Sequence, residues 1–270
     1  KLTYLAGLLL GLFLPISVIY FKNAFNTYIT SIEEINNLTE TPVVGEISKH
    51  SGAKLIVTKQ VEREEQSHTL ELFRLLRFNL EYLKHDQKNQ TILITSSVKG
   101  EGKTFIAANL ALSLASIGEK VALLSLDLRK PTLMSCFNLE EKIGVSDFII
   151  KKGIDKKSLF QTYNEIENLK LMGSGMVIGQ ISTTLLHERV GILINELKSE
   201  FDRIIIDTAP IGLVSDAYAL NPFVDSTIYV VRKDFTKKEH IGIVDNIYKN
   251  SKLNNCMILF NETEPKETYN

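Results

Sequence analysis

The sequence predicts an α/β fold, a doubly wound and mainly parallel sheet, preceded by one transmembrane helix. Three features predict it: an uncharged apolar stretch at the start, short apolar runs that alternate with helical patterns, and a glycine-rich turn between one such run and an apolar helix. Strands that are buried on both faces form continuous apolar runs, which is typical of a parallel sheet covered by helices. We divide the chain into a transmembrane helix (1–22), a juxtamembrane linker (23–66) and a C-terminal domain (67–270).

The first stretch, Leu2 to Phe21, lies between Lys1 and Lys22 and has the length that a helix needs to cross about 30 Å of hydrocarbon. A signal peptide is one alternative, but its apolar core is shorter and a small-residue cleavage site is missing here. A buried globular helix is the other. The charges that flank the stretch do not decide its orientation.

The linker is predicted to be irregular, with a short helix and a strand at 54–57. From Ser67 to about His85, apolar residues at spacings of three and four predict an amphipathic helix. We predict further strands at 91–95, 121–126, 169–172, 203–207, 227–231 and 256–260. Between them we predict helices near 103–117, 185–200 and 236–250.

Composition narrows the classes of function. The 270 residues carry a net charge of −1, which argues against electrostatic binding to nucleic acid. The two cysteines, Cys136 and Cys256, are too far apart in sequence for a CxxC metal site and too few for a disulfide framework. The five histidines show no metal-ligand spacing.

The turn after the strand at 91–95 matches the P-loop consensus GxxxxGK[ST], except that Ser97 replaces the first glycine. Backbone N–H groups and the following helix N-terminus would bind phosphate. Lys103 would neutralise the β- and γ-phosphates, and the Thr104 hydroxyl would ligate Mg²⁺. ATP and Mg²⁺ are therefore the expected cofactors. The predicted nucleotide-binding residues are Ser97, Val98, Lys99, Gly100, Glu101, Gly102, Lys103, Thr104 and Phe105.

Two other predicted strands end in charged residues. Asp207 ends the strand at 203–207, and Asp127 and Arg129 follow the strand at 121–126. Ligands bind at the carboxyl ends of such strands, where a carboxylate can order Mg²⁺ or accept a proton and an arginine can face phosphate. Ordinary strand-end turns are the alternative interpretation. We predict Lys103, Asp127, Arg129 and Asp207 as catalytic residues, and Thr104, Asp127 and Asp207 as metal ligands.

These motifs, in this order, resemble the bacterial tyrosine kinases (BY-kinases) of capsular and exopolysaccharide co-polymerases. The resemblance is carried by the apolar stretch and by four segments: 41–47 in the linker, GEGKT at 100–104, LDLRKP at 126–131 and IIIDTAPIGLVSDA at 204–217. In addition, Glu71, Arg74 and Arg77 match the ExxRxxR motif of that family. In the family this motif packs neighbouring subunits into a ring, so that the tyrosine tail of one subunit meets the ATP site of the next.

The resemblance implies a P-loop NTPase-type (MinD/ParA-like) fold and makes 67–270 a cytoplasmic tyrosine kinase domain. It implies a membrane-anchored autokinase, an octamer by family likeness, in the bacterial inner membrane with its kinase domain facing the cytoplasm. The implied partners are the polysaccharide polymerase and export machinery, a tyrosine phosphatase and the lipid bilayer. Asn261 matches a position where related folds recognise adenine, and Tyr269 is the candidate phosphoacceptor. We expect the chain to be the C-terminal part of such a protein.

The sequence has two main departures from the family. Ser125 stands where the DxDxR pattern has its first acid, and Tyr269 is the one tyrosine after Phe260. Three functions therefore remain open: an autokinase, an ATP-binding assembly scaffold that transfers phosphate poorly because of Ser125, and, ranked last, a partitioning or cell-division ATPase. Such ATPases usually carry a lysine where this chain has Val98.

Overall fold

The structure is a computed structural model that describes residues 4, 11–13, 15, 17, 26–49, 55, 68–82, 90–129, 131–151, 153–176, 188–212 and 216–264. In this part of the chain, one sheet of eight strands forms the centre, in the order β1-β8-β7-β2-β6-β3-β5-β4. Seven strands run parallel, and β4 pairs antiparallel with β5 at one edge. The strands are β1 Val43–Ser48, β2 Gln90–Ser96, β3 Val121–Leu126, β4 Phe160–Thr162, β5 Leu169–Met172, β6 Arg203–Thr208, β7 Ser226–Arg232 and β8 Cys256–Thr263.

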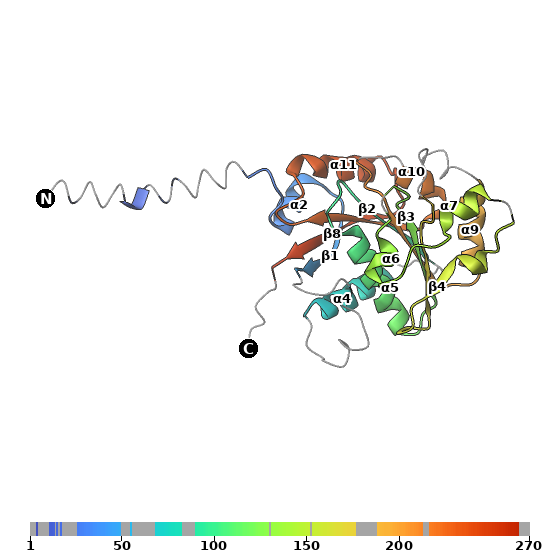
Figure 1. The fold of residues 1–270 in the computed structure, drawn as a ribbon. Helices are drawn as coiled ribbons and strands as arrows, with labels where there is room; N and C mark the ends of the chain where they lie inside the picture. Colours follow the sequence, from blue (N-terminus) through green and yellow to red (C-terminus); the bar gives the residue numbers. More distant parts are fainter. Residues whose placement is uncertain are drawn as a thin grey trace.

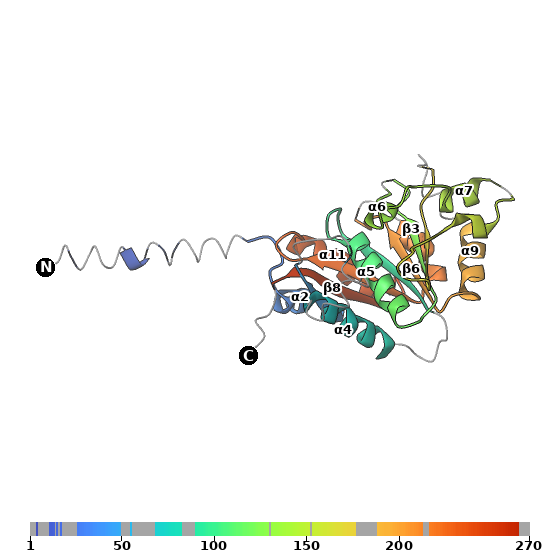
Figure 2. The same cartoon turned by 60° about the horizontal axis from the view of Figure 1, so that its bottom comes forward.

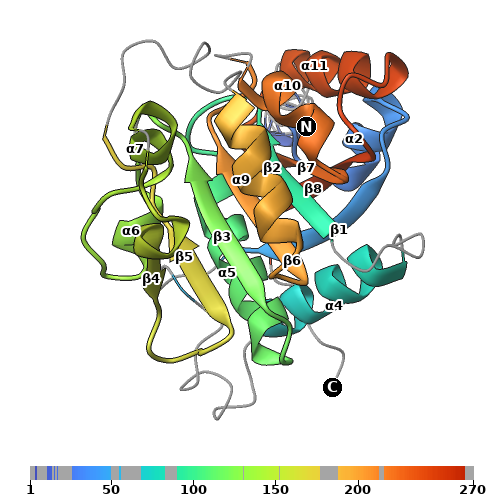
Figure 3. The same cartoon turned by 90° about the vertical axis from the view of Figure 1, so that its right-hand side faces the viewer.

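Helices cover both faces of the sheet (Figures 1 and 2). One apolar core lies under α4, α5 and α6, and the other under α2, α7, α9, α10 and α11. The helices are α2 Ile32–Leu38, α4 His68–Tyr82, α5 Lys103–Ser116, α6 Leu133–Cys136, α7 Val145–Ile150, α9 Glu188–Lys198, α10 Asp216–Leu220 and α11 Lys238–Lys249. Figure 3 shows α9 on one side of β3 and β6, with α5 behind them. The predicted doubly wound sheet is confirmed.

The central strands bury both of their faces, as their continuous apolar runs predict. In β6, Ile204 and Ile206 belong to one core and Ile205 to the other, and all three are at most 1% exposed. Leu93 of β2 faces one core, whereas Ile92 faces the other. Alternation of side chains along a strand sends successive residues to opposite faces, so a strand between two helical layers needs apolar residues throughout.

The segment predicted as an irregular linker contributes to the sheet. Its expected short helix is α2, but Val43–Ser48 forms β1, which pairs in parallel with β8 at the sheet edge. The sequence did not predict this strand because Gly45 and Glu46 interrupt its apolar run. Nor did it predict β4, which has three residues. The strand predicted at 54–57 lies almost wholly outside the described residues.

The predicted membrane span also lies mostly outside the described residues. Within the parts of the chain that are described, no helix combines the length and the apolar character needed to cross a membrane. The transmembrane helix therefore remains a prediction.

The chain before α2 is attached to the domain. The backbone of Ile29 exchanges hydrogen bonds with the turn between β7 and α11, donating to Thr236 O (2.9 Å) and accepting from Asp234 N (2.8 Å).

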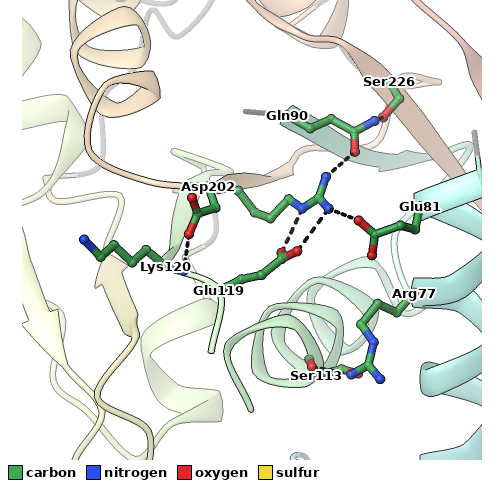
Figure 4. A network of polar contacts seen from close by, with 9 residues as sticks. Arg77, Glu81, Gln90, Ser113, Glu119, Lys120, Asp202 and Ser226 are labelled. Carbon is green, nitrogen blue, oxygen red and sulfur yellow. Dashed lines mark hydrogen bonds and ion pairs between the residues drawn. The ribbon is translucent and has the colours of Figure 1, made fainter. Parts of the chain in front are cut away.

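A buried arginine ties four elements together at the end of the sheet where β2 and β6 begin (Figure 4). Arg203 is 3% exposed, and its guanidinium donates through Nε (2.8 Å) and Nη2 (3.1 Å) to both carboxylate oxygens of Glu119. It also donates to Glu81 of α4 (3.1 Å) and to Gln90 Oε1 of β2 (2.9 Å). Paired and hydrogen-bonded in this way, the buried charge is compensated.

We predict that Arg203→Ala lowers the free energy of unfolding by about 2–3 kcal/mol, because the carboxylates that it pairs lose their counter-charge. Urea denaturation followed by circular dichroism would measure the change. Lys249→Ala breaks an exposed pair with Asp245 and is the matched control, expected to leave the midpoint almost unchanged. Equal effects of the two substitutions would contradict this interpretation.

Candidate nucleotide-binding site

The P-loop of this chain, residues 97–104, leads from the carboxyl end of β2 into α5. Gly100 and Gly102 adopt positive φ angles of 96° and 97°, which favour glycine. At Gly102 there is also no room for a side chain, since a Cβ would lie 2.2 Å from Asn261 Nδ2. The conformation of the loop thus allows its backbone N–H groups to contact a ligand. The loop ends at the N-terminus of α5, where N–H groups favour an anion.

Lys103 lies against the end of β2, with its side chain largely buried. It is 7% exposed, and its Nζ donates to Ser96 Oγ at 3.0 Å. Burial lowers the pKa of Lys103, while the charges of Asp207, Glu101 and Asp127 raise it. The lysine is therefore a buried cation among carboxylates, placed where the P-loop closes.

Thr104 and Asp207 meet across the site. The Thr104 hydroxyl donates to Asp207 Oδ2 at 2.7 Å, joining the first turn of α5 to the end of β6. Asp207 Oδ1 and Ser125 Oγ are both buried without a hydrogen-bond partner, and the register of β3 and β6 places these two residues opposite each other. Thr91 and Thr227 have such hydroxyls elsewhere, but here a carboxylate oxygen and a hydroxyl lie on paired strands beside the P-loop, an arrangement that suits a bound cation.

The oxygens at this place fit Mg²⁺. The Thr104 hydroxyl, the Asp207 carboxylate and the nearby Asp127 carboxylate are hard oxygen donors of the kind that Mg²⁺ takes. Mg²⁺ commonly completes its coordination shell with phosphate and water. In the described part of the chain, no cluster of three or more His, Cys, Asp or Glu side chains forms a metal cage.

Comparison with known proteins identifies the family of the chain. Residues 89–255 match the AAA domain family. The tyrosine-protein kinase YwqD of Bacillus subtilis is 33% identical over 193 residues, which is 72% of this chain and 81% of that protein. The chain belongs to the bacterial tyrosine kinase (BY-kinase) family.

Other relatives differ in how much of their length this BY-kinase chain matches. A putative tyrosine-protein kinase in the cps region of Klebsiella pneumoniae is 25% identical over 279 residues, which is 98% of this chain but 38% of that protein. The crystal structure of the chimerical protein CapA2B2 aligns with a TM-score of 0.77 at 28% identity, over 87% of this chain and all of that one. The septum site-determining protein MinD of Pyrococcus horikoshii, complexed with Mg-ADP, shares the fold (TM-score 0.50, 23% identity, over 64% of this chain and 69% of that one).

The LDLRKP segment of this BY-kinase brings Asp127 and Arg129 to the same sheet edge. Asp127 is half-buried, and its charge acts on both Lys103 and Asp207. Arg129 is exposed, and its backbone N–H donates to Asp127 Oδ1 at 3.4 Å. All four predicted catalytic residues therefore lie at the carboxyl ends of β2, β3 and β6. Their catalytic roles stay predictions.

Three of the predicted nucleotide-binding side chains are instead turned into the protein. Glu101 is fully buried and points back into the loop, where it accepts from Val98 N at 2.7 Å. Asn261 is 2% exposed and donates from Nδ2 to Glu101 O (2.9 Å). The Phe105 ring packs against Phe73 of α4, with 6.0 Å between the ring centroids. These side chains support the P-loop from beneath, and adenine recognition by Asn261 remains a prediction.

Several further supports of the P-loop, which the sequence did not predict, come from β7 and the turn after it. Tyr229 OH lies 2.8 Å from Ser97 Oγ, and Arg232 Nη1 donates to Gly100 O at 2.7 Å. The hydroxyl of Thr236 donates to Glu101 Oε1. No motif in the sequence could have found them, because they come together only through the order of the strands.

The ExxRxxR residues on α4 have two different environments. Glu71 and Arg74 form an exposed pair. Arg77 instead donates to Ser113 O of α5 at 2.8 Å, so it fastens α4 to the P-loop helix within one subunit. The intersubunit role that the family resemblance implies for Glu71, Arg74 and Arg77 remains a prediction. Tyr269 lies outside the described residues.

We predict that the metal-free protein becomes less stable as the pH rises from about 4 to about 7, in part through Asp207. Burial raises the pKa of this carboxyl to about 7, and the nearby charge of Asp127 adds to the effect, against the hydrogen bond from Thr104 and the charge of Lys103. The unfolded chain releases the proton near pH 4, so the folded state binds more protons in between, at a cost of at most about 4 kcal/mol by pH 7.

Thermal unfolding of the wild type and of Asp207→Asn, in chelator and without nucleotide, would measure this contribution. The difference between the two pH profiles should grow between pH 4 and 7, with the variant gaining relative stability. Parallel profiles would show that the carboxyl ionises normally in the folded protein.

Proposed function

We propose that the chain is a membrane-anchored, ATP-dependent protein-tyrosine autokinase that regulates capsular or exopolysaccharide polymerisation and export. The observation that carries the proposal is the contact between Thr104 and Asp207 beside the buried Lys103, at the head of a P-loop in a chain of this family. Relatives named as tyrosine-protein kinases support the activity, and one of them is named for a cps region.

Each residue of the site has a distinct role in this proposal. Bound Mg²⁺–ATP would supply the γ-phosphoryl group and a cation that offsets phosphate charge. The P-loop backbone and Lys103 would hold the phosphates, and Thr104 and Asp207 would hold the metal. Asp127 would accept the proton of an incoming tyrosine hydroxyl. Arg129 would face the charge that develops on the transferred group.

The membrane anchor, the assembly and the partners are part of the same proposal. The apolar stretch at 1–22 would anchor the chain in the inner membrane, with the kinase domain on the cytoplasmic side where ATP is available. The subunits would form a ring, an octamer by family likeness, and phosphorylate one another in trans at a tail tyrosine such as Tyr269. A tyrosine phosphatase would reverse the reaction, and the polysaccharide machinery would respond to it.

A second candidate function is an ATP-binding assembly scaffold with weak or no kinase activity. One observation favours it: Ser125 occupies the strand end where the family pattern has an acid, and its Oγ is buried without a partner. A serine there lacks the charge that would help to order a metal. The third candidate, a MinD/ParA-like ATPase, is disfavoured because the structural alignment with MinD is weaker than that with CapA2B2.

We predict that the purified chain, incubated with Mg²⁺ and labelled ATP, acquires phosphotyrosine detectable by mass spectrometry. Lys103→Met should abolish the label, because the buried cation that faces the phosphates is lost.

Ser125→Asp should raise the rate of autophosphorylation by roughly tenfold or more if the missing carboxylate limits that rate, as single acid–base or electrostatic groups do. ATP binding without label in the wild type would favour the scaffold.

We predict that Arg74→Ala and Arg77→Ala act differently, since only Arg74 points outward. Arg74→Ala should lower the oligomer mass in light scattering while the melting temperature stays close to that of the wild type. Arg77→Ala should lower the melting temperature as well, because it breaks the contact between α4 and Ser113. An unchanged oligomer in both variants would exclude this helix as the subunit interface.

A further inference from the structure

The P-loop contains a carboxylate that is buried in the protein. Glu101 is 0% exposed, and its two oxygens have separate partners. Oε2 accepts from the backbone N–H of Val98 at 2.7 Å, which closes the arch of the loop across residues 98–101. Oε1 accepts from the hydroxyl of Thr236, a residue that is also 0% exposed.

Thr236 is itself held firmly in the turn between β7 and α11. Its Oγ1 accepts from the backbone N–H of Arg232 at 2.9 Å, which leaves its own proton directed at Glu101. The last residue of β7 and this turn make two further contacts with the P-loop. Arg232 Nη1 donates to Gly100 O, and the Phe235 ring lies over Gly100, 3.0 Å from where a Cβ would be. The turn therefore holds the outer half of the P-loop.

A buried carboxylate needs hydrogen-bond donors and a nearby cation. Removing an ionised carboxyl from water is costly unless hydrogen bonds and a counter-charge compensate. Glu101 has two hydrogen bonds, and its charge acts on Lys103, the cation of the phosphate site. Glu101 therefore interacts both with the backbone of the P-loop, through Val98 N, and with the positive charge of Lys103.

We propose that Glu101 is a positioning residue for nucleotide binding, and that Thr236 holds it in place. The carboxylate fixes the backbone of residues 98–101 in the conformation that presents N–H groups to phosphate, before the nucleotide arrives. Such preorganisation raises the affinity for nucleotide, because the free-energy cost of ordering the loop does not have to be met when the nucleotide binds. The inference rests on the proposed ATP-binding function and assigns Glu101 a part in it without contact to the ligand.

Two matched pairs of variants separate this role from simple destabilisation. Glu101→Ala removes both contacts. Glu101→Gln keeps an oxygen that can accept from Val98 N, and its side-chain NH2 group can donate to the oxygen of the Thr236 hydroxyl. Thr236→Val keeps the shape of the side chain without its hydroxyl, whereas Thr236→Ser keeps the hydroxyl. Glu239→Ala, an exposed residue at the start of α11, is the surface control.

The measurement is titration calorimetry of Mg²⁺–ATP into the full 270-residue chain, with the melting temperature of each variant recorded in parallel. Glu101→Ala should raise the Kd about tenfold or more, and Thr236→Val several-fold, as expected for lost hydrogen bonds to a charged group. Glu101→Gln and Thr236→Ser should stay within about threefold of the wild type. In steady-state kinetics the loss should appear mainly in KM, with kcat less affected.

Wild-type affinity in Glu101→Ala, with only a lower melting temperature, would overturn the inference and leave the proposed function intact. If Glu101→Ala does not fold, the Thr236→Val and Thr236→Ser pair decides, and equal affinity of those two variants would overturn it. Failure of the wild type to bind ATP would overturn the proposed function and this inference together.

Discussion

The hydrogen bond between Thr104 and Asp207 is the constraint on which the rest of the site depends. It joins the helix that follows β2 to the end of β6, so it requires these strands to be neighbours and in register. The parallel order of the sheet satisfies this requirement and also brings β3, with Asp127 behind it, to the same edge. A buried carboxylate with one free oxygen results, beside a buried lysine.

The buried arginine and the buried aspartate lie at opposite ends of the sheet and have different environments. Where β2 and β6 begin, the Arg203 guanidinium finds acceptors on Glu119, Glu81 and Gln90, and that end is built for stability. At the carboxyl ends, Asp207 Oδ1 and Ser125 Oγ lack partners. Unsatisfied buried oxygens reduce stability. The pair beside the P-loop joins a carboxylate oxygen to a hydroxyl, the hard donors that a cation such as Mg²⁺ takes.

Local patterns were enough to predict much of the fold and the centre of the site. Apolar runs predicted six of the eight strands in the described sheet, and the GEGKT motif predicted the phosphate loop. What could not be predicted depends on tertiary structure. The edge strand β1 has no apolar run to reveal it, and Glu101 has the same sequence context whether it faces a nucleotide or Thr236. Arg77 matches an interface motif, yet its guanidinium reaches Ser113 in the same chain.

The most direct test of the central claim is the Mg²⁺ dependence of ATP binding in the wild type and in Asp207→Asn. If Thr104 and Asp207 hold the metal of a Mg²⁺–ATP complex, adding Mg²⁺ should tighten ATP binding to the wild type markedly. The variant should bind ATP with nearly the same affinity in the presence and absence of Mg²⁺. An equal gain from Mg²⁺ in both proteins would contradict the assignment of Asp207 as a metal ligand and show that the metal is held by other groups.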